Sequence, residues 1–265
     1  MENAYNQILA RQRQGLDRSV LQIIAILLVI TISCYYAGLF DISRLSDAIP
    51  SLLGLIGDML PPDFSGAKTW FKPLLDTVAM SVAGTALAIA FSLPLGFLAA
   101  RNSTPHPLVY QMARGLLNIL RSIPELILGI IFVAAVGFGA LPGVLALGLH
   151  SIGMIGKFFA EAIEHADKAP IEAARAAGAT PFQVVVHGIL PQVLPQMMDV
   201  SLYRWEYNFR ASTVMGMVGA GGIGFELMSS LRIMQYRDVS AILIVIFVMV
   251  TLADGLSAYL RKHFK

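Results

Sequence analysis

The chain has 265 residues, of which 56% are hydrophobic and only 14% are charged, with a formal net charge of +2. Soluble domains carry about 25% charged residues, so this composition excludes an ordinary soluble domain and indicates a lipid bilayer as the solvent. The sequence has no basic run interleaved with aromatic residues, so it does not indicate nucleic acid as a partner.

The first predicted transmembrane helix covers residues 20–40 and follows a polar N-terminal segment, residues 1–19. Residues 21–40 carry no charge, and at about 1.5 Å per residue they can cross a hydrocarbon core of about 30 Å. No small-residue cleavage site is evident, so we interpret this helix as a retained anchor and not as a signal peptide. Residues 41–73 then form an external, periplasmic segment.

The remaining residues, 74–265, are predicted to form a transmembrane core. Residues 77–100 make a second span. The apolar run 126–156 is too long for one span and is interrupted by "GFGALPG", which predicts two helices joined by a tight turn. Residues 183–225 must also cross if the topology is to close, and a last span begins near residue 239. Because backbone groups in hydrocarbon must bond internally, these spans are helices.

Six transmembrane helices place both termini on the same side of the membrane. More lysines and arginines fall on the side of the termini than on the other side, among them Arg18, Arg101, Arg121 and Lys168. The positive-inside rule therefore predicts an all-α integral membrane protein with its N- and C-termini in the cytoplasm.

The polar segment 161–182 is predicted to be a cytoplasmic hairpin. Pro170 fits the first turn of a helix, and Glu172 favours its positive end. Gly178 suits a left-handed stop, and Thr180 with Gln183 forms a capping box for a second helix. An ordinary connecting loop is the alternative, but so small and rigid an exposed surface is better suited to a protein partner.

The residues of this hairpin resemble the EAA loop of ABC-importer permeases. The match consists of the following residues, with Gly188 standing where the family has isoleucine: Glu172, Ala173, Ala174, Gly178, Leu190 and Pro191. The resemblance implies a type I ABC importer permease fold whose loop is a coupling helix docked in a separate ATPase subunit. The chain has no Walker A sequence, so ATP and Mg would be bound by that partner ATPase and no cofactor by this chain.

Four further stretches resemble the phosphonate-importer permeases, namely "PPDFS" at 61–65, "SLYRWEYNFRAST" at 201–213, "MVGAGGIG" at 217–224 and "RKHF" at 261–264. Phosphite and hypophosphite permeases are similar, and methionine permeases share the glycine stretch. The resemblance implies a homodimer in the lipid of the bacterial inner membrane, two ATPase subunits and a periplasmic solute-binding protein. It leaves open which anion is carried.

The glycine stretch also matches the G-x-G-x-x-G pattern of dinucleotide sites. No buried strand precedes it, and Asp238 leads into an apolar span, so a nucleotide pocket is not expected. We instead expect a helix break with close packing, for which these glycines are suited: Gly219, Gly221, Gly222 and Gly224. The alternative is that their N–H groups contact a passing anion.

Three charged residues of the fifth span are candidates for the translocation path: Arg204, Glu206 and Arg210. Glu206 and Arg210 are spaced for a helical ion pair, which would be a structural clamp. Arg204 has no acidic residue four positions away, and an arginine fork matches the oxygens of a phosphonate or phosphite. We therefore expect Arg204 or Arg210 to line the path, with Arg204 favoured, and His150 to be a core histidine.

Two other classes of protein remain as alternatives. A proton-coupled secondary transporter would use Asp199 or Glu206 as its titrating group, but we find no inverted repeat. A membrane-embedded enzyme would need catalytic residues or a metal site, and no motif predicts either. We therefore expect a transport subunit without covalent chemistry.

Overall fold

The computed structural model describes residues 2–263, so Phe264 of the "RKHF" stretch and the two terminal residues Met1 and Lys265 lie outside the described part. Between residues 2 and 263 the chain forms helices and no strand, which confirms the all-α fold. It divides into two units, Met1–Asp58 and Met59–Lys265.

The first unit holds α1 (Glu2–Tyr36) and α2 (Ile42–Asp58). The second unit, here called the compact unit, holds the remaining elements in this order: α3 (Phe71–Leu98), α4 (Pro107–Ser122), α5 (Glu125–Val136), α6 (Ala140–Glu164), α7 (Lys168–Ala176), α8 (Pro181–Gln183), a π-helix η1 (Val184–Ile189), α9 (Leu190–Met215), a 3-10 turn η2 (Gly216–Val218), α10 (Ile223–Arg232) and α11 (Tyr236–His263).

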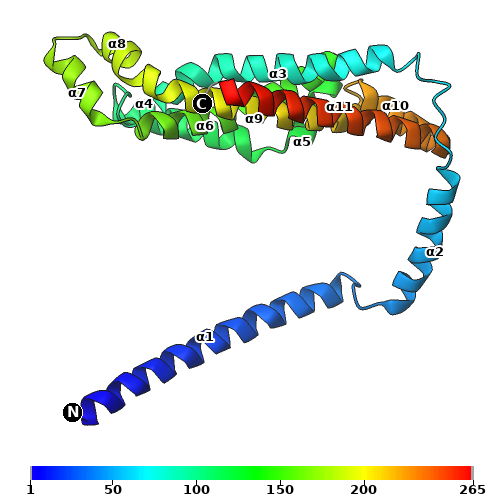
Figure 1. Cartoon of the computed structure of the whole chain (residues 1–265), viewed down its shortest axis with the longest axis horizontal. Helices are drawn as coiled ribbons and strands as arrows, with labels where there is room; N and C mark the ends of the chain where they lie inside the picture. The colour runs from blue at the N-terminus through cyan, green and yellow to red at the C-terminus, as the bar shows by residue number, and fades with distance from the viewer. Residues whose placement is uncertain (1, 264–265) are drawn as a thin grey trace. The chain divides into compact units, whose positions relative to one another are not determined.

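The core of the compact unit lies where α3, α6 and α9 pack on one another, with α11 against α9. These helices run alongside each other in Figure 1, with the α7–α8 hairpin at one end and α10 at the other. Small residues allow the close approach. A Cβ added to Gly96 of α3 would lie 2.8 Å from Cβ of Phe159 on α6, so a larger residue there would separate the two helices.

Residues 41–73, the segment expected to be external, are divided between the two units. They contain helix α2, and the compact unit begins at Met59, well before residue 74. Ser240 Oγ donates to the carbonyl oxygen of Met59 at 2.6 Å, and Asp63 N donates to the carbonyl oxygen of Arg237 at 3.1 Å. These bonds hold residues 59–70 against α11. Nothing in the local sequence predicts this long-range contact.

Four helical segments are long and apolar enough to cross a membrane: Ser19–Tyr36, Phe71–Leu98, Ala140–Glu164 and Tyr236–Lys262. Two bent helix pairs can supply further spans, α4 with α5 at 85° and Pro181–Val218 with α10 at 42°. The described residues thus supply four spans, or up to six if each pair counts as one.

The expected third span was wrong in its extent. The turn at residues 137–139 was predicted, but α5 has only 12 residues and covers about 18 Å, too little to cross the hydrocarbon core alone. A longer span needs the bent pair with α4, which carries Arg114 and Arg121 and was not among the expected spans. The break between the two falls at Ile123, whose position before Pro124 disfavours helical backbone. Likewise, α6 continues to Glu164, into the segment 161–182.

Candidate functional site

The hairpin between α6 and α9 has the predicted local structure. Gly178 adopts a φ of +80° after α7, and Thr180 and Gln183 form the capping box, with Thr180 N donating to Gln183 Oε1 at 2.8 Å. One detail was wrong. The helix begins at Lys168, capped by Asp167, so Glu172 lies in its second turn and not at its positive end. Asp167 was missed because Pro170 suggested a later start.

The hairpin presents a small exposed surface on a fixed base. Glu172, Ala173 and Gly178 are exposed, whereas Ile171 is buried. A Cβ on Gly188 of η1 would lie 3.4 Å from Cα of Ile171, so the branches of an isoleucine would push against the α7 backbone. The glycine that departs from the EAA pattern therefore allows η1 to pack closely on α7.

Arg204 lies in the interior of the compact unit and is only 5% exposed. Its Nε donates to Ser151 Oγ of α6 at 2.8 Å, and its guanidinium carbon lies 4.2 Å from the centre of the Tyr207 ring. Its Nη2 is buried without a hydrogen-bond partner among the described residues. A guanidinium in this position is costly, because its Nη2 has lost its hydrogen bonds to water and has gained no acceptor in the described part of the protein.

The contacts of Arg204 continue into a polar network across the core. Ser151 Oγ donates to Asn208 Oδ1 at 3.0 Å, and Asn208 Nδ2 donates to Thr85 Oγ1 of α3 at 2.9 Å. Asn208 is fully buried. Three helices are therefore joined by directional bonds, which fix the rotation of α9 and with it the position of Arg204.

A second polar group connects α5, α6 and α9. Tyr207 donates its hydroxyl to Glu125 Oε1 at 2.6 Å, while Glu125 Oε2 lies 3.4 Å from His150 Nε2. His150 is 8% exposed and its Nδ1 lies 3.0 Å from the carbonyl oxygen of Ile123, which confirms a hydrogen-bonded core histidine. A cavity of about 230 Å³ opens beside Glu125, Tyr207 and Arg210.

The predicted ion pair of α9 is present and is part of a longer chain of charges. Arg210 Nη2 contacts Glu206 Oε1 at 3.0 Å, and its Nη1 contacts both carboxylate oxygens of Asp254 on α11 at 3.0 and 3.2 Å. Arg261 Nη2 contacts Glu206 Oε2 at 2.7 Å. Positive and negative groups thus alternate along a row of four side chains, in which Glu206 and Arg210 of α9 lie between Arg261 and Asp254 of α11. Arg204 is separate from this chain and keeps its own partners.

The glycine stretch forms the predicted helix break. Helix α9 ends at Met215, and three glycines before α10 adopt positive φ, with values of +101° at Gly219, +76° at Gly221 and +75° at Gly222. Ile223 N donates to Thr77 Oγ1 of α3 at 2.9 Å, and a Cβ on Gly222 would come within 2.6 Å of that oxygen. A Cβ on Gly224 would overlap the carbonyl oxygen of Thr213. A helix, and not a strand, precedes the break, so the geometry of a dinucleotide site is absent.

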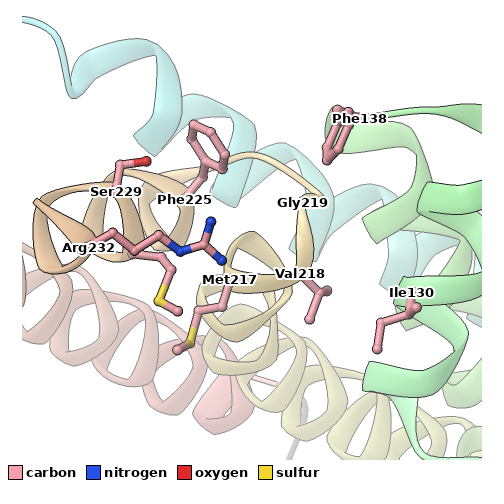
Figure 2. Close-up of a pocket in the computed structure, with 9 residues that line it drawn as sticks. Ile130, Phe138, Met217, Val218, Gly219, Phe225, Ser229 and Arg232 are labelled. Carbon is pink, nitrogen blue, oxygen red and sulfur yellow. The ribbon is translucent and has the colours of Figure 1, made fainter.

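A cavity of about 330 Å³ lies beside this break, as Figure 2 shows. Its walls come from α5 and the turn after it, from the break itself and from α10, through the following residues: Ile130, Phe138, Met217, Val218, Gly219, Phe225, Met228, Ser229 and Arg232. The Arg232 side chain extends from α10 toward Met217, with Phe138 across the cavity. The lining is mainly apolar, with one cation. Among residues 2–263, no cluster of histidine, cysteine, aspartate or glutamate could hold a metal ion.

Sequence reasoning missed the partners that other elements contribute, namely Glu125, Ser151, Asp254 and Arg261. Glu125 and Asp254 carried a signal that could have been used, because each is an acidic residue at the edge of or within an apolar run. Ser151 carried none, since a serine in a transmembrane helix commonly bonds to its own backbone.

Known proteins are similar to this chain in sequence and in helical fold. Residues 92–265 match the family described as "Binding-protein-dependent transport system inner membrane component". The chain is 67% identical over 251 residues to a phosphite transport system permease protein of Stutzerimonas stutzeri, covering 95% of this chain and 91% of that protein. It is 42% identical over 232 residues to a phosphate-import permease protein of Mycolicibacterium smegmatis, covering 88% of this chain and 44% of that protein.

A solved structure of the MetNI methionine ABC transporter, in an inward-facing conformation, has the same fold. The TM-score is 0.65 at 23% sequence identity, with 74% of this chain and 96% of that chain covered. At this level of identity the likeness concerns the fold, and it carries nothing about the transported solute.

Proposed function

Because the chain belongs to the family of binding-protein-dependent transport system inner membrane components, we propose that it is the permease of an ATP-driven importer for phosphonate-type anions, with phosphite foremost. The protein is an inner-membrane transport subunit with an ABC-importer permease fold. The observation that carries the choice of anion is the 67% identity to a phosphite permease over 95% of the chain. Methionine has weaker support, from a probable D-methionine permease that is only 29% identical over 203 residues and from a likeness of fold.

The proposed assembly contains two copies of this chain, two ATPase subunits and a periplasmic solute-binding protein, surrounded by lipid. The α7–α8 hairpin would dock to the ATPase through Glu172, Ala173, Ala174 and Gly178. Its exposed small residues and its capped, buried base support this role. The hairpin and both termini would then face the cytoplasm, and the α10 end the periplasm.

In this proposal the chain performs no covalent chemistry and binds no cofactor. The partner ATPases would bind ATP and Mg, and their closure would move the two hairpins. Because η1 continues directly into α9, a displacement of the hairpin reaches the buried polar network of that helix. The cavity between the two copies would open outward in the ATP-bound state and return after hydrolysis.

Arg204 is the residue that we assign to the translocation path. Its Nη2 lacks an acceptor among the described residues, and a passing oxyanion supplies one in a fork geometry that suits phosphite or phosphonate. The Tyr207 ring beneath the guanidinium and the Ser151 hydroxyl at Nε hold it in place. Glu206 and Arg210 belong to the same polar stretch of α9, and we propose that they act mainly as a clamp on α11.

ATP-dependent uptake tests this proposal. The permease, its ATPase and its solute-binding protein are reconstituted in proteoliposomes and supplied with labelled phosphite, methylphosphonate, phosphate or methionine. We expect uptake of phosphite and of at least one related phosphorus oxyanion, and none of methionine. Uptake of methionine would contradict the anion assignment. Uptake driven by a proton gradient without ATP would instead support the secondary transporter.

A further inference from the structure

Helix α2 has an apolar stripe along one side. Five aliphatic side chains of α2 are each more than half exposed: Ile42, Ile49, Leu52, Leu53 and Ile56. At about 100° per residue these positions fall within an arc of about 100° of the helix surface. Ser43, Asp47, Ser51 and Asp58 lie on the opposite side. The helix is therefore amphipathic, with Leu55 as an apolar residue outside the stripe, toward Ser51.

The preceding helix determines where α2 begins. The apolar part of α1, Ser19–Tyr36, is one of the candidate membrane spans, and none of it is buried against protein. Only residues 37–41 connect α1 to α2, and they are folded into turns, with Gly38 N donating to the carbonyl oxygen of Tyr35 and Asp41 N to that of Gly38. The first residue of α2 is thus held within a short distance of the end of a span.

Helix α2 does not have the properties of a span itself. It has 17 residues, it carries two aspartates and three serines, and it is absent from the candidate spans. An amphipathic helix can lie in the plane of the membrane interface, with its apolar side among the acyl chains and its polar side in water. A water-exposed helix would leave the five aliphatic side chains unburied, which opposes the hydrophobic effect.

We propose that α2 is an interfacial anchor, lying along the membrane surface at the end of α1 with its apolar stripe buried among lipid acyl chains. The stripe follows a candidate membrane span after only five residues. It also consists of isoleucine and leucine alone, without the aromatic, methionine or arginine residues that are enriched in protein interfaces. Lipid is therefore the occupant that its composition fits.

Site-directed spin labelling tests the proposal in the assembled permease–ATPase complex. Cys34 is the single cysteine, so a Cys34→Ser background allows one label at a time. Ile49→Cys and Leu53→Cys report on the stripe, and Asp47→Cys and Ser51→Cys are matched controls on the polar side. The complex is placed in nanodiscs of phosphatidylethanolamine and phosphatidylglycerol, and collisions with oxygen and with a water-soluble nickel chelate are measured.

The stripe labels are expected to collide mainly with oxygen, at a depth of about 5–10 Å, and the control labels mainly with the nickel chelate. Low collision rates with both reagents at the stripe would show that protein covers it, whether the compact unit or a second copy, and would overturn the proposal. Nickel collisions as frequent at the stripe as at the controls would place α2 in water and overturn it as well. None of these readouts depends on which anion is transported.

Discussion

The coupling hairpin and the interior of α9 are held together in different ways. In the hairpin, the contacts that shape the turn join residues a few positions apart, as in the Thr180–Gln183 capping box and the positive φ of Gly178, and only its base is tied over a longer range, by Asp167 and Gln192. In α9, Arg204 and Arg210 depend on Ser151 and Asp254, which lie 53 and 44 positions away. The conformation of the hairpin is thus encoded mainly by its own residues, whereas the charged residues of α9 depend on partners from other helices.

The largest expected effect comes from two adjacent glycines that differ in their surroundings. Both have positive φ, which costs a larger residue about 1–3 kcal/mol, and Gly222, with a ψ of −175°, lies in a region that essentially only glycine adopts. Gly222→Leu also drives a side chain into Thr77, where overpacking adds roughly 1–3 kcal/mol, whereas Gly221 has no neighbour closer than 3.7 Å. We expect Gly222→Leu to reduce assembled complex far more than Gly221→Leu, measured by thermal unfolding in detergent.

Equal losses at the two glycines would show that backbone conformation alone matters at this break. Addition of NAD should change neither melting curve, since the break lacks the geometry of a nucleotide site. A shift of the wild-type curve with NAD would contradict this.

Within the hairpin, Gly178→Val is expected to lower ATP-driven uptake at least about tenfold while the membrane bundle still assembles. A β-branched residue is strongly disfavoured at a φ of +80°, so the elbow that presents the docking surface would distort. Gly178→Asn is the matched control, because asparagine tolerates this conformation. Normal coupling of ATPase activity to uptake in Gly178→Val would show that the elbow is not part of the dock.

Arg204→Gln is expected to reduce uptake by at least about tenfold, as a charged hydrogen bond to an anion is worth roughly 1.5–3 kcal/mol. ATPase docking should persist, since Arg204 is buried in the interior and is not part of the exposed surface of the hairpin. Arg204→Lys should restore part of the uptake, because it keeps the charge and loses the fork. The measurement is initial uptake rate per assembled complex, and wild-type rates in Arg204→Gln would remove Arg204 from the path.

The smallest effect is expected at Arg210. The sequence suggested that its loss would leave Glu206 unpaired, but Arg261 also binds Glu206 at 2.7 Å. Arg210 is 42% exposed, so Arg210→Gln should cost no more than about 1 kcal/mol of stability. Arg261→Gln serves as the comparison, and the double variant should cost clearly more than the sum of the two. Complete inactivity of a well-assembled Arg210→Gln variant would reassign the path to this arginine.

Residue order by itself determined the membrane class, the helical backbone, the hairpin with its glycine elbow and the helix break at residues 219–222. These features follow from rules that act within a few residues: hydropathy over one span, caps, and glycine at positive φ. The Glu206–Arg210 pair belongs here too, because four residues of helix bring the two side chains to one face.

Tertiary structure alone decided the rest. It joined α4 to α5 as one bent pair, fixed residues 59–70 to α11, and supplied Ser151, Glu125, Asp254 and Arg261 to the charges of α9. The physical reason is that a buried polar group must find its partner wherever packing places one, and nothing in the local chain records which distant residue that is.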